Sequence, residues 1–447
     1  MPRASALDAF VRIAGGVTSR FPRKGARVLD SVLYPLLGNP LLAGYFRRHN
    51  RKNLAKIEKF DHLLVISDIH IGDAILFQTA VSALRDFFPQ ARIDYLVKTS
   101  VKALLEGNPD ITDLWPVFTG GQFPNPKDNL TVQAMAAEYD AVFNFSPFFP
   151  SALFPEPKKV FHFTSQAPLF VLNEAHPGVP NHITYQAHRF VYDLLSPVFP
   201  IRRARPFGGP SVFLPPEAVA EARRFLEGKA GSRKGPVVFL NPDTASPYTR
   251  VPVRYLTRLL TGLVGMRLEP GAGQDKPVRG ETPLVLMGEG HTDKGIGEKL
   301  MFSLPVIARE RVKLVPAGFS LEAYAALVDR SDVFISGDTG PLHLAAAWKK
   351  DRAGKHPFRN KTAVISLFGA TPPRFSGYDS RPGFLESGQG AESRSFQSQS
   401  ACRNLTCMHK MGKECDAVGC FQGLDVEAIL SQIHGVLMEK KAVSHTS

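Results

Sequence analysis

Residues 62–89, HLLVISDIHIGDAILFQTAVSALRDFFP, hold the pattern that decides the fold. The apolar run at 63–66 predicts a buried strand, and SDIHIGD predicts a turn that contains glycine. Residues 74–88 have the spacing of an amphipathic helix that ends before Pro89. Strand, turn and helix in this order form the first part of a βαβ unit, and a series of such units predicts a parallel sheet.

The same alternation continues along the chain in two groups. Further strands are predicted at 91–100, 111–117, 139–147, 235–243, 282–290, 311–318, 331–338 and 362–371. A basic segment with Pro and Gly, residues 200–210, separates the two groups. We therefore expect an α/β protein with two Rossmann-like, doubly wound parallel-sheet domains that face each other across a cleft. Ligands of such sheets bind at the carboxyl ends of the strands.

Length and composition agree with two domains. The chain has 447 residues, 44% of them hydrophobic, which is too many for one ordinary core. The expected division is a basic helical extension, an N-terminal Rossmann-like domain, a C-terminal Rossmann-like domain and a C-terminal helix with a tail that crosses back to the first domain. The respective bounds are 1–60, 61–205, 206–425 and 426–447.

Most of the net charge of +13 lies at the start of the chain, where residues 1–60 contain twelve Lys and Arg and three acidic residues. The apolar stretch 31–46 is interrupted by Pro35, Gly38 and Pro40, so it is too short to span a bilayer of about 30 Å. No secretory signal pattern is present, and a cytoplasmic protein is expected. Two interpretations of the basic segment stay open: a solvated extension that packs on the body, or a contact with an anionic membrane surface.

Several side chains that can bind a ligand or transfer a proton lie close together in FISGDTGPLHLAAA, residues 334–347, where a predicted strand is followed by a helix. Asp338, Thr339 and Gly340 stand at the turn and His343 one helical turn later. Backbone N–H groups at such a turn favour an anion such as a diphosphate. The alternative is an ordinary helix cap with a packed histidine.

The motifs GDTGPLHLAAA and ISLFGATPP, together with IHIGDAILFQTAVSALRDFFPQARIDYLV near the start, resemble glycosyltransferase family 9, the ADP-heptose:lipopolysaccharide heptosyltransferases. The resemblance covers residues 61–440. It implies a GT-B fold and an inverting, metal-independent transfer of heptose from ADP-heptose to the lipid A-linked inner core of lipopolysaccharide. It also implies a peripheral position on the inner face of the inner membrane and no nucleic-acid partner.

The resemblance also implies roles for single residues. Asp73 matches the aspartate that acts as general base on the acceptor hydroxyl, since the acceptor oxygen must lose a proton as it attacks the anomeric carbon. The alternative for Asp73 is a carboxylate that caps the following helix. Asp338, Thr339 and Gly340 match the turn that holds the donor sugar and diphosphate, and His343 matches the histidine that follows it.

The segment NPDTASPYTRVPVRYL, residues 241–256, departs from the family pattern. Thr244 matches the hydroxyl of a phosphate-facing loop, but Val251 and Pro252 replace a Trp-Pro pair. Thr249 stands where a lysine is usual, so Arg250 is the candidate cation for the leaving diphosphate.

Two further donor contacts are implied. Asp293 resembles the acid that binds the ribose hydroxyls, with Glu289 as a competitor and a surface acid as the alternative. Phe319 lies at the adenine pocket or in the core. The segment 348–361 is predicted to be a basic surface insertion, either a solvated loop or a contact for an anionic acceptor, and 385–400 a polar loop.

All four cysteines fall within nineteen residues, at Cys402, Cys407, Cys415 and Cys420. In a cytoplasmic chain this clustering favours a structural metal, Zn or Fe, over disulfides. Reduced structural thiols and a regulatory disulfide stay open, and His409 is a spare ligand. No cofactor is expected for catalysis. The alternative functions are a heptosyltransferase that acts on a protein acceptor and a nucleotide-sugar-binding protein that has lost its activity.

Overall fold

The computed structural model describes the chain in fifteen stretches. They are residues 40–67, 70–118, 126–146, 159–163, 182–203, 205–230, 235–244, 249–268, 281–290, 295–352, 358–369, 371, 373–379, 392–398 and 419–446. The chain divides after Pro210 into two compact units.

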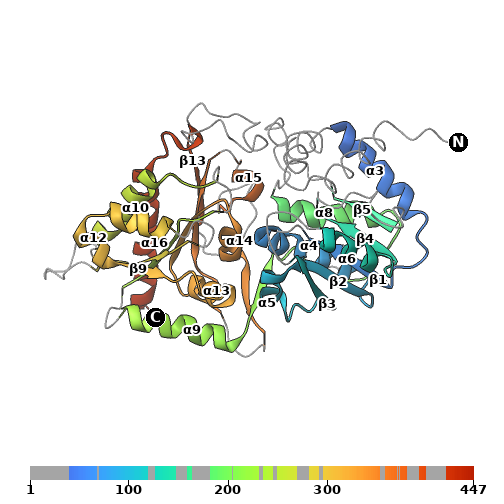
Figure 1. The fold of residues 1–447 in the computed structure, drawn as a ribbon, viewed down its shortest axis with the longest axis horizontal. Coiled ribbons are helices and arrows are strands. Elements are labelled where there is room, and N and C mark those ends of the chain that lie inside the picture. Colours follow the sequence, from blue (N-terminus) through green and yellow to red (C-terminus); the bar gives the residue numbers. More distant parts are fainter. Residues whose placement is uncertain are drawn as a thin grey trace. The chain divides into compact units, whose positions relative to one another are not determined.

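The first unit contains a five-stranded sheet in the order β3-β2-β1-β4-β5, with every pair parallel (Figure 1). Its described elements are α3 (Pro40–Leu54), β1 (His62–Ile66), α4 (Ile71–Phe87), β2 (Arg92–Lys98), η1 (Thr99–Val101), α5 (Lys102–Leu105), β3 (Asp113–Phe118), α6 (Pro126–Ala136), β4 (Ala141–Asn144), β5 (Val160–His162) and α8 (Ile183–Leu195).

Helices cover both faces of this sheet. Leu64, Ile66 and Val142 form one apolar cluster with Val132 and Ala136 of α6. The alternate residues of the same strands point to the other face, where α4 and α8 pack side by side. Burial of both faces explains why these strands are continuous apolar runs rather than alternating ones.

The helix α3 belongs to the first unit and covers the edge strand β5. The side-chain Nδ2 of Asn50 donates to the carbonyl of His162 at 2.9 Å, and the His162 N–H donates to Oδ1 of Asn50 at 3.1 Å. Asn50, Asn53 and Leu54 are buried at this contact. The described part of the basic segment is therefore packed on the body, as one of its two interpretations expects.

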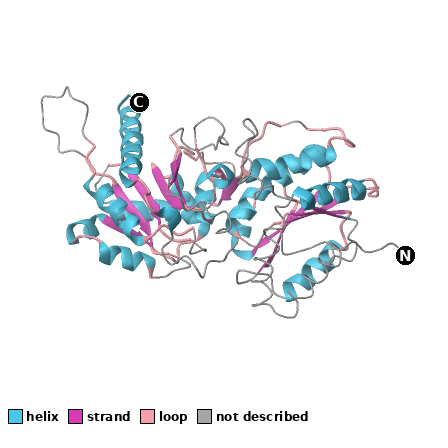
Figure 2. Cartoon of the chain, turned by 90° about the horizontal axis from the view of Figure 1, so that it is seen from above, coloured by secondary structure: helices cyan, strands magenta, loops and turns pink. Residues whose placement is uncertain are grey.

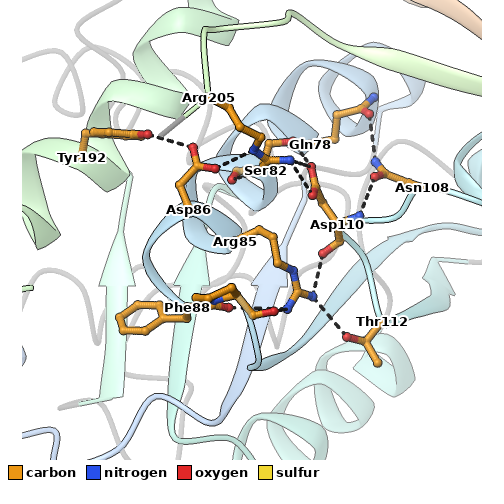
Figure 3. Close-up of polar contacts among 11 residues, drawn as sticks. Gln78, Ser82, Arg85, Asp86, Phe88, Asn108, Asp110, Thr112, Tyr192 and Arg205 are labelled. Carbon is orange, nitrogen blue, oxygen red and sulfur yellow. Dashed lines mark hydrogen bonds and ion pairs between the residues drawn. The ribbon is translucent and has the colours of Figure 1, made fainter. Parts of the chain in front are cut away.

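A buried ionic network fixes the C-terminal half of α4. Arg205 donates from Nε to Asp86 Oδ1 at 2.6 Å and from Nη1 to Asp110 Oδ1 at 2.8 Å, as Figure 3 shows. Tyr192 of α8 donates to the other oxygen of Asp86 at 2.8 Å. Arg85 of the same helix donates to the backbone oxygen of Asp110 at 3.0 Å. Both carboxylates are buried, so α4, α8 and the segment that leads out of the unit are held together.

The second unit contains a six-stranded sheet in the order β13-β12-β10-β7-β8-β9, again parallel throughout, and a small parallel pair of β6 and β11. Its described elements are β6 (Ser211–Leu214), α9 (Pro216–Ala230), β7 (Val237–Asn241), α10 (Val253–Gly265), β8 (Leu284–Gly288), α11 (Ile296–Ser303), α12 (Val306–Arg311), β9 (Val312–Val315), α13 (Leu321–Asp329), β10 (Val333–Gly337), α14 (Gly340–Ala346), β11 (Trp348–Asp351), β12 (Ala363–Phe368), α15 (Pro373–Ser376), β13 (Arg394–Gln397), η4 (Gly419–Phe421) and α16 (Val426–Thr446).

The core of this unit has two layers of helices. α10 and α16 pack on one face of the sheet, where Leu240, Ile335 and Ile433 belong to a single apolar cluster. On the opposite face Tyr324 of α13 packs against Phe239, with ring centroids 4.9 Å apart. Figure 1 shows α10 and α16 on one side of the sheet and α13 and α14 on the other.

The C-terminal helix α16 packs on this second sheet. Its buried residues Val426, Ile429, Ile433 and Leu437 lie in the same cluster as the strands β7 and β10. Figure 2 shows this helix, which carries the C-terminus, beside the magenta strands. The sequence prediction assigned the helix to a crossing back to the first domain, whereas its buried face contributes to the core of the second unit.

Two predicted loops are wrong in part. Trp348–Asp351, expected to begin a surface insertion, form strand β11, and Lys349 within it is buried. Arg394–Gln397, expected to lie in a polar loop, form the edge strand β13 beside β12. Both strands are short and polar, and they are ordered by pairing with a neighbour rather than by their own hydrophobic pattern.

Candidate functional site

Each sheet has a topological switch point. In the first sheet β1 lies between β2 and β4, and in the second sheet β7 lies between β8 and β10. Loops that leave neighbouring strands in opposite directions open a crevice at the carboxyl ends of those strands, which is where such folds bind ligands. The loops after β1, β7 and β10 carry most of the residues that the sequence analysis singled out.

In the second unit the loops after β7 and β10 are in contact through Gly337. A Cβ added to Gly337 would lie 2.7 Å from the carbonyl oxygen of Thr249 and 3.2 Å from Cγ2 of Thr244. No side chain fits at that distance from a backbone oxygen, which explains glycine at the end of β10. The structure therefore brings the Thr244 loop against the Asp338 turn.

The β7 loop is held by its own polar contacts. The side-chain Nδ2 of Asn241 donates to the carbonyl of Asp243 at 2.8 Å and to Oγ of Ser336 at 3.0 Å. Arg250 donates to Oδ1 of Asp243 at 3.3 Å and to the carbonyl of Thr244 at 3.1 Å. The Arg250 side chain is 24% exposed, so the loop presents a guanidinium that is already oriented.

In the β10 turn, Thr339 is the N-cap residue of α14, but its side chain makes no capping hydrogen bond. The carboxylate of Asp338 accepts a hydrogen bond from Oγ of Ser376 at 3.0 Å, and His343 Nε2 lies 3.9 Å from the same oxygen. Gly340 is the first residue of α14. His343 is buried, and its Nδ1 lies 3.1 Å from the Tyr378 hydroxyl.

The predicted adenine and ribose contacts are placed in part. Phe319 follows β9 and packs edge-on against Phe225 of α9, with ring centroids 5.3 Å apart. Glu289, at the end of β8, accepts a hydrogen bond from the N–H of Ala317 at 3.0 Å and so ties the β8 and β9 loops together. Asp293 lies outside the described residues.

In the first unit Asp73 lies in the loop-to-helix transition after β1. The helix α4 begins at Ile71, three residues earlier than predicted, and its N-cap residue is His70. Asp73 is therefore inside the first turn, and the N-cap position belongs to His70. Its Oδ2 lies 3.5 Å from Nδ1 of His70, and its side chain is 32% exposed. A carboxylate that reaches solvent beside an imidazole can accept a proton from a bound hydroxyl group.

The predicted cysteine cluster falls mostly on residues that the structure does not describe, namely Cys402, Cys407, Cys415 and the spare ligand His409. Cys420, in η4, is buried. Within the described ranges no three His, Cys, Asp or Glu side chains are placed to hold a metal ion. No helix in the same ranges has the length and apolar character needed to cross a membrane.

Sequence reasoning missed Ser376 and Tyr378, which contact Asp338 and His343. The available signal was the polar run PRFSGYD after β12, since residues that follow the carboxyl end of a strand lie at the same sheet edge as the turn after β10.

The fold is similar to that of two solved glycosyltransferases. A glycosyltransferase family 9 protein from Veillonella parvula DSM 2008 shares 15% identity and a TM-score of 0.58, over 86% of this chain and 99% of that one. The ADP-heptose LPS heptosyltransferase II of E. coli shares 15% identity and a TM-score of 0.54, over 85% of this chain and 99% of that one. A search of curated protein sequences finds no match. The chain has two Rossmann-like parallel sheets, and its fold is similar to those of these glycosyltransferases. It therefore has the GT-B fold.

Residues 284–405 match the family model described as glycosyltransferase family 9 (heptosyltransferase). This segment begins with β8, includes the β10 turn and extends past β13. The protein is therefore a glycosyltransferase that carries a family 9 domain.

Proposed function

We propose that the protein transfers heptose from ADP-heptose to the inner core of lipopolysaccharide, with inversion at the anomeric carbon and without a divalent metal. The observation that carries the proposal is the meeting of the β7 and β10 loops at the switch point of the second sheet. There Thr244, Arg250, Asp338 and His343 are grouped around a glycine that lets two backbones touch. The family 9 match covers the β10 half of this group.

In the proposed reaction Asp73 takes the proton of the acceptor hydroxyl as its oxygen bonds to the anomeric carbon. The bond between that carbon and the diphosphate oxygen breaks, and ADP leaves with the electron pair. Attack from the face opposite the diphosphate gives inversion. The Arg250 guanidinium, held by Asp243, balances the charge that develops on ADP, and Thr244 and Asp338 hold the diphosphate and sugar. Asp293 and Phe319 are assigned to the ribose and the adenine.

The proposal is tested with purified protein, ADP-heptose and three acceptors: core oligosaccharide that lacks heptose, an unrelated protein mixture, and water. We expect ADP release and an inverted anomeric linkage with the core oligosaccharide only, both unchanged by EDTA. Transfer to protein alone would assign the alternative acceptor. Binding of ADP-heptose without any transfer would mean that the protein has lost its activity.

The base is tested by Asp73→Asn, which keeps shape and removes the proton acceptor. We expect kcat to fall by about 10² to 10⁴ while ADP affinity is unchanged. Asp193→Asn, a change at an exposed carboxylate on α8, is the control and should leave both unchanged. Full activity of Asp73→Asn would refute the role of Asp73.

We further propose that α3 brings the protein to an anionic membrane surface on the cytoplasmic side, because its outward face is basic. Arg47, Arg48, Arg51 and Lys52 of α3 are exposed, while Asn50 and Leu54 face the sheet, and the exposed Lys56 and Lys59 follow the helix. Replacing Arg47, Arg48, Arg51 and Lys52 with Gln should weaken binding to phosphatidylglycerol vesicles by up to about a thousand-fold, at about 1 kcal/mol for each charge. Sedimentation with phosphatidylcholine vesicles is the control, and equal binding to both lipids would contradict the proposal.

If the protein is cytoplasmic, its four cysteines are in a reducing compartment, where disulfides are rare. We therefore propose that Cys402, Cys407, Cys415 and Cys420 hold a structural Zn or Fe ion. Metal analysis of the purified protein, before and after Cys402→Ser and Cys407→Ser, tests this: one metal equivalent per chain that is lost in the double variant supports it.

A further inference from the structure

The segment after β12 is locked against the edge strand β13. A Cβ on Gly377 would lie 2.5 Å from the carbonyl oxygen of Pro373 and 2.7 Å from Oγ of Ser395. Ser395 donates from Oγ to the carbonyl of Tyr378 at 3.0 Å and from its N–H to Asp379 Oδ2 at 3.2 Å. Asp379 is also 3.6 Å from Nη1 of Arg394. Backbone and side-chain contacts thus fix the position of this segment.

Two side chains of the locked segment reach the β10 turn. Ser376 donates to Oδ1 of Asp338, and the Tyr378 hydroxyl lies 3.1 Å from Nδ1 of His343. Tyr378 has no solvent exposure, and Ser376 is 4% exposed. Asp338 and His343 therefore each have a buried partner from the same short segment.

The contacts of His343 decide which ring nitrogen carries the proton. Burial and the nearby Asp338 carboxylate raise the pKa of Tyr378, so its hydroxyl stays protonated and can donate to Nδ1. Nε2 then carries the hydrogen and faces the Asp338 carboxylate. With the reverse tautomer a bare Nε2 would face that carboxylate, acceptor against acceptor, which is unfavourable.

We propose that Tyr378 and Ser376 are positioning residues for the donor site: Tyr378 holds His343 in the tautomer with hydrogen on Nε2, and Ser376 holds the carboxylate of Asp338. The turn then presents to a nucleotide sugar a carboxylate whose orientation is set by the Ser376 hydroxyl and by the Nε2–H of His343 beside it. This role rests on the proposed function, since it assumes that the nucleotide sugar binds at the β10 turn. The tautomer itself does not depend on that assumption.

The tautomer is tested by ¹⁵N NMR of the histidine side chains at pH 8, with the His343 signals identified by their loss in His343→Gln. We expect a protonated Nε2 and an unprotonated Nδ1 in the wild-type protein, and a mixture of both tautomers in Tyr378→Phe. Hydrogen on Nδ1 in the wild type would overturn the assignment. An unchanged spectrum in Tyr378→Phe would overturn the positioning role.

Donor kinetics test the functional part. Loss of one buried neutral hydrogen bond predicts a fall of about fivefold to tenfold in kcat/KM for ADP-heptose in Tyr378→Phe, mainly through KM. Ser376→Ala should give a similar fall. The matched control is Tyr255→Phe, which removes a hydroxyl that accepts from the Gly423 N–H in the same unit and should leave KM unchanged.

The outcomes separate the two proposals. If the tautomer is as expected but the wild-type protein neither binds ADP nor turns over ADP-heptose, the proposed function fails and the positioning geometry stands. If the wild type is active and Tyr378→Phe leaves both the NMR spectrum and KM unchanged, the positioning role fails and the proposed function stands. A KM effect of equal size in Tyr255→Phe would reduce the role of Tyr378 to general stability.

Discussion

Lys349→Met should change how the stability of the second unit depends on pH. Lys349 lies on β11 and is 2% exposed, and its Nζ donates to the carbonyl of Ala345 near the end of α14. Burial lowers the pKa of Lys349 to about 7 from its ordinary value of 10.5, and the Asp329 carboxylate opposes this shift without cancelling it.

The sign follows from proton counts. Between pH 7 and 10.5 the unfolded chain keeps the proton on Lys349 and the folded chain has lost it. The free energy of unfolding therefore rises with pH through this window and falls as pH drops towards 7. The full slope is about 1.4 kcal/mol per pH unit, so the wild type should gain about 2.5 kcal/mol between pH 7.5 and 9.5 relative to Lys349→Met. For a domain of this size that corresponds to about 5–10 °C in Tm.

Tryptophan fluorescence measures this in the unit concerned. The chain has two tryptophans, Trp115 in the first unit and Trp348 next to Lys349 in the second. In a Trp115→Phe background the thermal transition of Trp348 reports the second unit, with and without Lys349→Met, from pH 7.5 to 9.5. Lys350→Met, at the exposed neighbour on the same strand, is the control. A Tm difference between wild type and Lys349→Met that stays constant within 2 °C over this range would refute the reasoning.

Two further substitutions test the ionic network of the first unit and the contact between the β7 and β10 loops of the second unit. Arg205→Leu leaves the buried carboxylates of Asp86 and Asp110 without their cation and should lower the free energy of unfolding by about 3 kcal/mol in urea titrations. The control Arg189→Leu, at an exposed ion pair, should lower it by less than about 0.5 kcal/mol. Equal effects would contradict a stabilising role of the network. Gly337→Ala forces a Cβ against the carbonyl oxygen of Thr249 and should weaken ADP binding at least tenfold by calorimetry. The control Gly265→Ala has open space around the added Cβ and should leave the affinity unchanged. Unchanged ADP affinity in Gly337→Ala would mean that the nucleotide does not bind at this turn.

Much of the fold follows from local pattern. The central strands are buried on both faces, so their apolar runs are visible in the sequence. β7 and β10 lie within the predicted ranges, and β1 begins one residue before its predicted start. The edge strands are different. β11 and β13 contain Lys and Gln and take their extended form from one neighbour each, so their own residues give no period-two signal.

The candidate site divides in the same way. Asp338 and His343 stand in one continuous strand, turn and helix, and the sequence contains that whole motif. Their partners Ser376 and Tyr378 lie 38 and 35 residues further along the chain, on a segment positioned by β13. A contact across that distance depends on sheet order, which spacing along the chain does not encode. The burial of Lys349 could not be predicted from the sequence either, because a lysine within a basic run has the composition of a surface loop.

The side chain of Asn50 makes the hydrogen bonds that a neighbouring strand would make. It donates to the carbonyl of His162 and accepts from its N–H, two groups that an edge strand would otherwise leave open to a second molecule. Removal of α3 would expose the N–H and C=O of His162 at this edge, and exposed strand edges can pair with strands of other molecules. The segment that gives the protein most of its net positive charge thus also covers the β5 edge of the first sheet.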